Sequence, residues 1–137
     1  MRNTFHVAIF VKDIEEAVAR YRRILGTEPA KLRHDYAKFE LADPPVIFSL
    51  NVGGPPGTLS HLGIRYPGTG EVASEMVRTK AEGIELLQQK DTTCCYAKAD
   101  KFWVRDVDQI PWEMYTLLAD ADAQTSSDSS LREFLGQ

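Results

Sequence analysis

Apolar residues in the first third of the chain change from the repeat of a strand to the repeat of a helix and back again. The run Phe5–Val11 is β-branched and aromatic, which predicts a short strand. From Ile14 to Leu25 the apolar positions follow helical spacing, with Asp13 as the N-cap and Gly26 as the residue that ends the helix. Short strands are then predicted at Ala30–Arg33, Ala37–Leu41 and Val46–Asn51.

The same order of elements returns after a Gly/Pro-rich connector at residues 52–58. The pattern predicts a strand at Leu59–Arg65, a helix from about Gly70 to Glu82 that stops at Gly83, and strands at Ile84–Gln88, Cys94–Lys98, Phe102–Val104 and Trp112–Leu117. The sequence HVAIF from His6 matches HLGIR from His61, and KFELADPP from Lys38 resembles KFWVRDVD from Lys101. The repeat indicates an α+β fold of two βαβββ modules, at about residues 4–51 and 59–118.

Length, composition and charge limit the number of domains and the kinds of partner that this chain can have. A chain of 137 residues with 43% hydrophobic content suits one compact domain. A net charge of -4, with acids and bases spread along the chain, argues against nucleic acid or anionic lipid as a partner. No apolar run approaches the roughly 18 residues of a membrane span. We therefore expect a cytoplasmic protein that binds a small molecule, with a flexible tail at residues 119–137 that holds one or two helical turns.

Two histidines occupy the same place in the two modules. His6 and His61 each lie early in the strand that opens its module, so adjacent opening strands would point both imidazoles into one cavity. Glu113 is a carboxylate within the apolar closing strand PWEMY, where a buried acid is costly unless it is paired or bound to a cation. The alternative is an outward-facing Glu113 on an alternating strand. Two imidazoles and one carboxylate form the facial arrangement of non-heme Fe(II).

The corresponding strand of the first module carries no acid. Val46–Leu50 reads VIFSL, so a four-ligand site with one carboxylate from each module is not expected. This pattern favours an open, oxygen-activating iron over a more saturated Ni(II) or Zn(II) centre.

The only two cysteines, Cys94 and Cys95, are adjacent. Neighbours cannot form an unstrained disulfide, so we expect free thiols in a reducing compartment. On a regular strand one thiol would face inward and the other outward, which opposes chelation of one atom. If Asp91–Thr93 instead forms a turn or irregular loop, both sulfurs can face the same way. Thiolates select soft centres such as As(III), Cd(II) or Hg(II).

The duplicated order of elements, with His6 and His61 on the opening strands and Glu113 on the last strand, resembles the vicinal-oxygen-chelate superfamily of glyoxalases, bleomycin resistance proteins and dioxygenases. The resemblance covers about residues 4–118. It implies that the modules form an incomplete barrel around a metal, with these three residues as ligands. The absent acid in Val46–Leu50 departs from glyoxalase I and matches the three-ligand dioxygenases.

A narrower resemblance is to the ArsI/CadI-type group, the non-heme iron carbon-arsenic lyases and cadmium-induced proteins. The sequences that carry it include EPAK from Glu28, DYAKF from Asp35 and TTCCYA from Thr92. It implies that Cys94 and Cys95 bind a trivalent organoarsenical beside Fe(II), and that O2, as co-substrate, cleaves the carbon-arsenic bond to leave arsenite. Gln109-Ile110 departs from the group's Gly-Asn-like turn, and the tail lacks the extra cysteines of some members.

Two alternatives remain beside the lyase. One is a non-enzymatic protein that binds cadmium or a metalloid through the dithiol. The other is a different glyoxalase or extradiol-dioxygenase metalloenzyme in which the cysteines are incidental. Because members of the superfamily often pair, the resemblance also implies a homodimer.

Overall fold

The computed structural model describes residues 3–94, 97–120 and 129–135, which divide into two compact units. The N-terminal unit is Thr4–Leu62, and the C-terminal unit runs from Gly63 onward and includes Asn3. Strand β5 (Leu59–Arg65) is divided between them, so His61 belongs to the N-terminal unit. The fold is α+β, a mixed sheet built from βαβββ modules.

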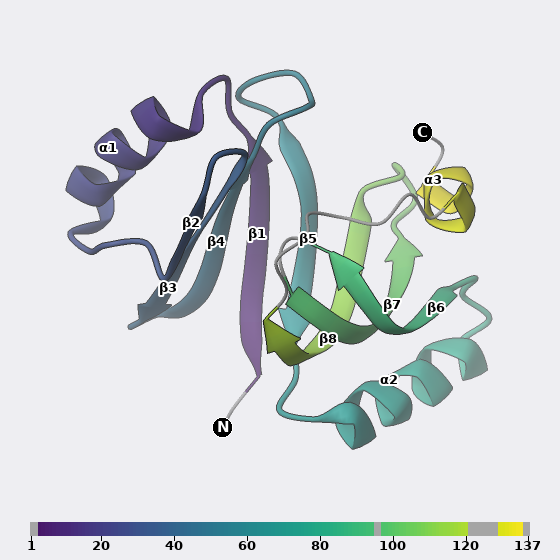
Figure 1. Ribbon diagram of the computed structural model, residues 1–137. Helices are drawn as coiled ribbons and strands as arrows, with labels where there is room; N and C mark the ends of the chain where they lie inside the picture. Colours follow the sequence, from purple (N-terminus) through teal and green to yellow (C-terminus); the bar gives the residue numbers. More distant parts are fainter. Residues whose placement is uncertain (1–2, 95–96, 121–128, 136–137) are drawn as a thin grey trace. The chain divides into compact units, whose positions relative to one another are not determined.

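In the N-terminal unit a sheet carries one helix on its outer face (Figure 1). Its strands are hydrogen-bonded in the order β2-β3-β4-β1-β5, with β1 and β4 parallel and β3 antiparallel to both β2 and β4. Its elements are β1 (Thr4–Phe10), α1 (Ile14–Leu25), β2 (Lys31–Arg33), β3 (Tyr36–Ala42), β4 (Pro45–Asn51) and the first residues of β5.

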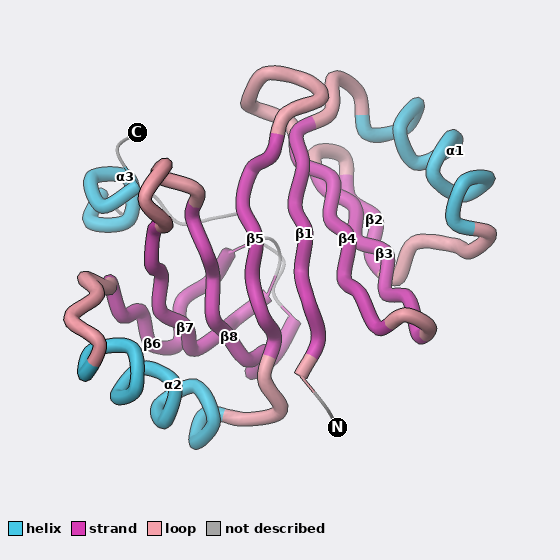
Figure 2. The backbone as a smooth tube through the Cα atoms, turned by 180° about the vertical axis from the view of Figure 1, so that it is seen from behind, coloured by secondary structure: helices cyan, strands magenta, loops and turns pink. Residues whose placement is uncertain are grey.

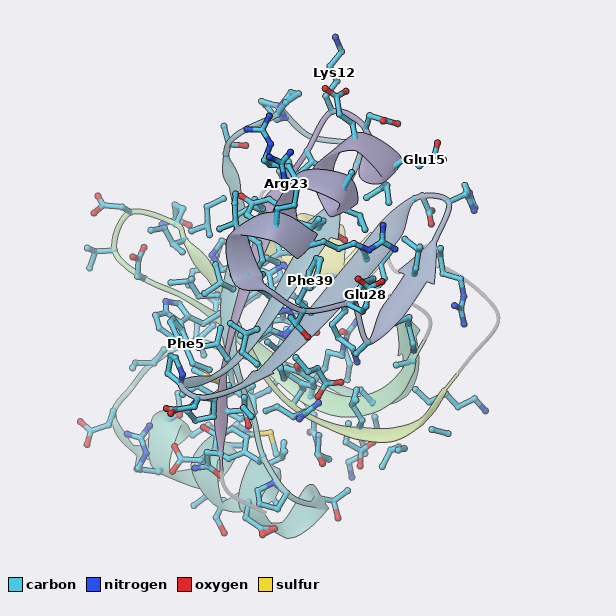
Figure 3. The ribbon with its side chains drawn as sticks, turned by 90° about the vertical axis from the view of Figure 1, so that its left-hand side faces the viewer. Phe5, Lys12, Glu15, Arg23, Glu28 and Phe39 are labelled. Atoms are coloured by element: carbon cyan, nitrogen blue, oxygen red, sulfur yellow. The ribbon has the colours of Figure 1, made fainter. Side chains whose placement is uncertain are left out.

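Helix α1 begins and ends at the residues that its sequence predicts. The Asp13 carboxylate accepts a hydrogen bond of 2.9 Å from the backbone N–H of Glu16, and Gly26 ends the helix with φ of 68°. Its buried face packs Ile14 and Val18 on a cluster that includes Phe39. Figure 3 shows Lys12 and Glu15 pointing away from the sheet and Phe39 lying beneath the helix.

The C-terminal unit repeats this plan with its own helix against its own strands (Figure 2). Tyr66, Val72 and Phe102 form the centre of its core. The strand order is β5-β8-β7-β6, and β7 pairs antiparallel with both neighbours. Its elements are α2 (Thr69–Ala81), β6 (Leu87–Cys94), β7 (Ala97–Arg105), β8 (Pro111–Asp120) and α3 (Ser129–Leu135).

The predicted elements of the first module are confirmed to within one residue at each end, but the strands of the second module are wrong in part. The predicted strands Cys94–Lys98 and Phe102–Val104 are not separate, because β7 runs unbroken from Ala97 to Arg105. Lys101, which lies between the two predicted strands, is buried in β7 and forms an ion pair with Glu113. A polar residue with a buried partner continues a strand as well as an apolar one does.

For Asp91–Thr93 the sequence left open a regular strand or a turn or irregular loop, and the structure has a strand. These residues lie within β6, although the pairing register with β7 shifts between Gln89 and Thr92. The polar sequence LQQKDTTC hides this strand from a hydropathy pattern. Gln89 in this strand is buried, and its side-chain carbonyl accepts a hydrogen bond of 3.1 Å from Trp103 Nε1 that compensates for the lost contact with water.

The C-terminal part of the chain contains helix α3 and a turn in which Gln109 has a positive φ. The seven residues of α3 confirm the prediction of one or two helical turns in the tail, while residues 121–128 lie outside the described residues. Gln109 takes a φ of 70° in the turn before β8, a backbone conformation that glycine adopts more readily than other residues. None of the helices in the described residues is long and apolar enough to cross a membrane.

Candidate metal centre

His6 is held in the interior of the N-terminal unit by a serine on the neighbouring strand. The histidine lies on β1 and is 6% exposed. Its Nε2 atom is 2.9 Å from the hydroxyl of Ser49 on β4, a residue that is 1% exposed. A buried hydroxyl needs a hydrogen-bond partner, and the imidazole supplies one here.

His61 lies on β5, the strand on the other side of β1. Its Nδ1 atom is 3.0 Å from the hydroxyl of Ser60, and the ring centroids of His6 and His61 are 5.5 Å apart with the planes tilted by 47°. The structure therefore brings together the two histidines that the repeat singled out. They come from different strands and are 55 residues apart in the sequence (61 minus 6).

The spacing of the two imidazoles fits a shared metal ion. A metal–nitrogen bond of about 2.1 Å plus roughly 1 Å from nitrogen to ring centre keeps two rings on one ion within roughly 6–7 Å of each other. The centroid distance of 5.5 Å lies inside that limit. Each ring has one nitrogen next to a serine hydroxyl, and ligating histidines usually have a hydrogen-bond partner on the nitrogen that does not bind the metal.

Glu113 is a buried carboxylate in the C-terminal unit. It lies on β8, is 6% exposed, and accepts a hydrogen bond of 2.6 Å from Lys101 Nζ on β7. The alternative of an outward-facing Glu113 is therefore wrong. The carboxylate sits where a cation is required, because an ionised acid at this depth is unstable alone. In this structure the ammonium of Lys101 is that cation.

The strand register shows which residue of the first module corresponds to Glu113. Glu113 pairs with Trp103, two residues after Lys101, and Ile47 pairs with Glu40, two residues after Lys38. Since Lys38 and Lys101 are equivalent in the repeat, Ile47 is the counterpart of Glu113. The expectation that this strand carries no second acidic ligand agrees with the apolar, fully buried Ile47.

The predicted ligands His6 and His61 belong to the N-terminal unit, and Glu113 belongs to the C-terminal unit. Within either unit, the described side chains include no group of three or more His, Cys, Asp or Glu that could hold a metal ion. The set of three ligands therefore stays a prediction. His34, the remaining histidine, is on an exposed turn beside Asp35.

The cysteine pair is described only in part. The backbone of Cys94 ends β6 and pairs with Ala97 at the start of β7, whereas Cys95 and Tyr96 lie outside the described residues. Cys94 therefore ends β6, and Ala97 and Lys98 belong to β7, so these described residues do not share the strand Cys94–Lys98 that the sequence predicted. Their role in binding a substrate remains a prediction.

Two partners of the predicted ligands escaped the sequence pattern. Ser49 is the one hydroxyl in the apolar run VIFSL, and its isolation in that run was the available signal. Lys101 was noted only as part of the repeat, since a lysine in a strand usually faces solvent. Both contacts join residues on different strands, so strand pairing had to be known before they were visible.

Comparison with known proteins places these features in a family. Residues 4–114 match the model of the Glyoxalase/Bleomycin resistance protein/Dioxygenase superfamily. The chain is 38% identical over 126 residues to a trivalent organoarsenical cleaving enzyme of Thermomonospora curvata, covering 90% of this chain and 83% of the relative. It is 39% identical over 117 residues to the cadmium-induced protein CadI of Mycobacterium tuberculosis, covering 85% and 77%.

A solved structure supports the fold. The Mn(II)-bound glyoxalase from Novosphingobium aromaticivorans superposes with a TM-score of 0.61 at 16% identity, covering 89% of this chain and 41% of that chain. The similarity at this identity concerns the fold alone. The sequence match, the relatives and the fold agree, and the chain belongs to the glyoxalase/bleomycin resistance protein/dioxygenase superfamily.

Proposed function

We propose that this protein is an Fe(II)-dependent dioxygenase-type lyase that cleaves the carbon-arsenic bond of trivalent organoarsenicals. The observation that carries the proposal is the pair formed by the buried His6 and the half-buried His61, whose ring centroids are 5.5 Å apart, in a chain 38% identical to a trivalent organoarsenical cleaving enzyme. A pair of neutral imidazoles with one carboxylate is the donor set of non-heme iron sites that leave positions open for substrate and dioxygen.

The residues have separate roles in this proposal. His6, His61 and Glu113 hold the metal, which when bound supplies open positions for the activation of dioxygen. Lys101 neutralises the Glu113 carboxylate and keeps it from being a lone buried charge when no metal is bound. Cys94 and Cys95 bind arsenic, each thiol replacing one of the two hydroxyls of the organoarsonous acid substrate and releasing one water. Thiolates suit this task because As(III) is a soft centre.

The overall reaction balances without an external reductant. For a methyl substituent, methylarsonous acid and one dioxygen give formaldehyde and arsenous acid. The carbon-arsenic bond breaks, one oxygen atom ends on carbon and the other on arsenic. The methyl carbon is oxidised, dioxygen is reduced, and arsenic remains trivalent.

Arsenite release is the direct test. The reduced protein is loaded with Fe(II) without oxygen, given methylarsenite and then air, and arsenite is separated and measured. We expect release from the wild type and from His34→Ala, the matched control in which the exposed third histidine is removed. His61→Ala is expected to lose release. An iron-loaded, reduced wild type that releases no arsenite would rule out the proposal.

A second candidate is a non-enzymatic binder of cadmium or a metalloid, favoured by the 39% identity to a cadmium-induced protein. In this case the fold is a scaffold for the dithiol. Cys94→Ser then abolishes Cd(II) binding while His61→Ala leaves it intact, and neither the wild type nor any variant releases arsenite. Equilibrium dialysis with Cd(II), run beside the arsenite assay, separates the two candidates.

A further inference from the structure

Two lysines are equivalent in the repeat, and both are buried. Lys101, 4% exposed, donates to the buried Glu113 carboxylate at 2.6 Å. Lys38 is 9% exposed, and the first module has the apolar Ile47 in place of Glu113. The Nζ atom of Lys38 is 3.4 Å from Glu40, a carboxylate on the same strand whose side chain is 37% exposed. The first module therefore has a buried cation but no acid at the position of Glu113, and a buried ammonium favours a nearby anion.

A second polar group on this part of the sheet is buried without an acceptor. The side-chain amide nitrogen of Asn51, at the end of β4, has no hydrogen-bond partner among the described residues. A buried donor that makes no hydrogen bond costs free energy, and such groups are rare in folded proteins. An acceptor brought by a ligand would remove this cost.

Lys38 and Asn51 lie on the same face of the N-terminal sheet. Side chains alternate between the two faces of a strand, and the neighbouring residues Phe39 and Leu50 belong to the core cluster under α1. Lys38 and Asn51 therefore face away from that helix (Figure 1). Lys38 pairs with Ser49, two residues before Asn51, so Lys38 and Asn51 are diagonal neighbours on adjacent strands, about 7–8 Å apart. A long lysine side chain spans that separation, so one ligand group can contact both residues.

This face is also the one that carries His6. The hydroxyl of Ser49 on β4 is 2.9 Å from His6 Nε2, and β1 and β4 are neighbouring parallel strands (Figure 2). His6 pairs with Ile47, which in turn pairs with Glu40, two residues after Lys38. Spacings of about 4.8 Å between strands and 3.3 Å between residues put the backbones of Lys38 and His6 roughly 12 Å apart. A small organic molecule spans a distance of this order.

We propose that Lys38 and Asn51 form a carboxylate subsite that selects organoarsenicals whose alkyl substituent ends in a carboxylate. This inference rests on the proposed function, because it takes arsenic to lie beside the metal centre that includes His6. The ammonium of Lys38 and the Nδ2 amide of Asn51 both donate hydrogen bonds, and a carboxylate has two oxygens that accept them. Neither residue touches the carbon-arsenic bond, so both act in binding.

The selectivity is tested by the binding of two matched arsenicals to reduced, iron-free protein. 3-Carboxypropylarsonous acid and butylarsonous acid have the same number of carbons, and only the first has a carboxylate. Hydrogen bonds to charged groups predict that the wild type prefers the carboxylate by about 10- to 100-fold, measured by calorimetry. We expect Lys38→Met to lose this preference and Asn51→Asp, which replaces the donor amide by an anion of similar shape, to reverse it. Equal affinities of the wild type for both arsenicals overturn the proposal.

Lys12→Met is the matched control for the loss of one positive charge. Lys12 is exposed next to α1, and Figure 3 shows it pointing away from the sheet. This variant should keep the wild-type preference for the carboxylate. If Lys12→Met loses the preference as Lys38→Met does, the effect comes from net charge and the subsite is refuted.

The Asn51 amide itself gives a second readout. The reduced protein is labelled with ¹⁵N, and the side-chain amide resonances of Asn51, identified by their absence in Asn51→Asp, are followed in ¹H–¹⁵N correlation spectra. We expect them to shift with 3-carboxypropylarsonous acid or with butyrate, which contains no arsenic, and to remain unchanged with butanol. Resonances that neither carboxylate shifts overturn the role of Asn51.

The outcomes separate this inference from the proposed function. If the carboxylate preference and the resonance shifts are found but iron-loaded wild type releases no arsenite from methylarsenite, the lyase proposal fails and the subsite stands. If arsenite is released but the wild type shows no preference for the carboxylate, the subsite alone fails. The binding and resonance measurements need no iron and no turnover, so the two failures cannot be confused.

Discussion

Gly63 is the residue of β5 at which a side chain has no room. A Cβ atom built on Gly63 would collide with the backbone carbonyl oxygen of Glu113, and a carbonyl in a strand cannot rotate away as a flexible side chain can. The first module has Ala8 at the equivalent position of its opening strand. Because Gly63 has no side chain, the backbone of β8 can approach β5 closely at Glu113.

We expect Gly63→Ala to lower the free energy of unfolding by about 1–3 kcal/mol, the cost of an overpacked interior. Gly70→Ala is the matched control: nothing lies within 4 Å of its added Cβ in α2, so this variant should be neutral or more stable. Urea unfolding followed by circular dichroism measures both. Equal stabilities for the two variants would contradict the close contact with Glu113.

The ion pair of Lys101 and Glu113 is buried on both sides, with side chains 4% and 8% exposed. Removing one partner of such a pair leaves the other charge buried without a counter-ion, which lowers the free energy of unfolding by about 3–5 kcal/mol. Replacing both partners by apolar residues removes that penalty. The pair thus gives the buried Glu113 carboxylate a cationic partner.

Lys101→Met is expected to lose about 3–5 kcal/mol of unfolding free energy, and the double variant Lys101→Met/Glu113→Leu to regain most of it. Lys38→Met is the control at the equivalent position, because its partner Glu40 at 3.4 Å is 37% exposed and water can solvate it. The loss of unfolding free energy in Lys38→Met should be clearly smaller than that in Lys101→Met. Urea denaturation of the four proteins checks this order, and an undisturbed Lys101→Met would refute it.

At the scale of elements, the start of α2 is tied to β8 through Tyr66. Its backbone N–H donates to the carbonyl of Tyr115 at 2.7 Å, and its ring packs with Val72 and Phe102. Burial raises the pKa of the Tyr66 hydroxyl above 10.0, the charge of Glu75 raises it further, and Arg78 opposes the shift. Ionisation of Tyr66 is therefore harder in the folded protein than in the unfolded chain.

This shift predicts a loss of stability in alkali. Because the folded pKa is raised, the contribution is fully present below the unfolded pKa of 10.0 and is lost as pH rises through the folded value. We expect Tyr66→Phe to reduce the fall in unfolding free energy above about pH 10, whereas Tyr21→Phe on α1 should keep the wild-type slope. Urea titrations at several alkaline pH values give the slopes; identical slopes for all three proteins would disprove the argument.

The element scale also shows where sequence patterns failed. Helix α1 was predicted at both ends because its N-cap, stop and buried face depend on residues within it. Strands β6 and β7 were misread because Gln89 and Lys101 are polar residues that are buried against partners on other strands. A hydropathy pattern counts such residues as exposed, and only strand pairing shows that they are satisfied inside.

At the scale of the whole molecule, the proposed function predicts that a metal ion stabilises the folded protein. A metal that binds the folded protein alone raises the unfolding free energy by mass action, about 2.7 kcal/mol when its free concentration is 100 times the dissociation constant. We expect anaerobic Fe(II) or Mn(II) to stabilise the wild type and His34→Ala. His6→Ala, His61→Ala and Glu113→Gln should each lose most of this effect.

Urea unfolding with and without metal, in reducing buffer, measures the stabilisation. If Glu113→Gln is stabilised as much as the wild type, Glu113 is not a ligand and the carboxylate belongs only to its ion pair with Lys101. If none of the three variants differs from the wild type, the metal binds elsewhere. Cys94→Ser is the control for metal binding by the thiols. This variant should still be stabilised by Fe(II) or Mn(II), because these metals are harder than the centres that thiolates prefer.

The sequence by itself determined the duplicated βαβββ plan and the equivalence of His6 and His61, because both follow from local periodicity and from a repeat that can be read along the chain. Tertiary structure decided that the two imidazoles meet, that Ser49 engages Nε2 of His6 and that Lys101 neutralises Glu113. These contacts depend on strand order and register, which hydrogen bonds between distant segments establish. The spacing of residues along the sequence does not show on which side of a strand its hydrogen-bonded neighbour lies.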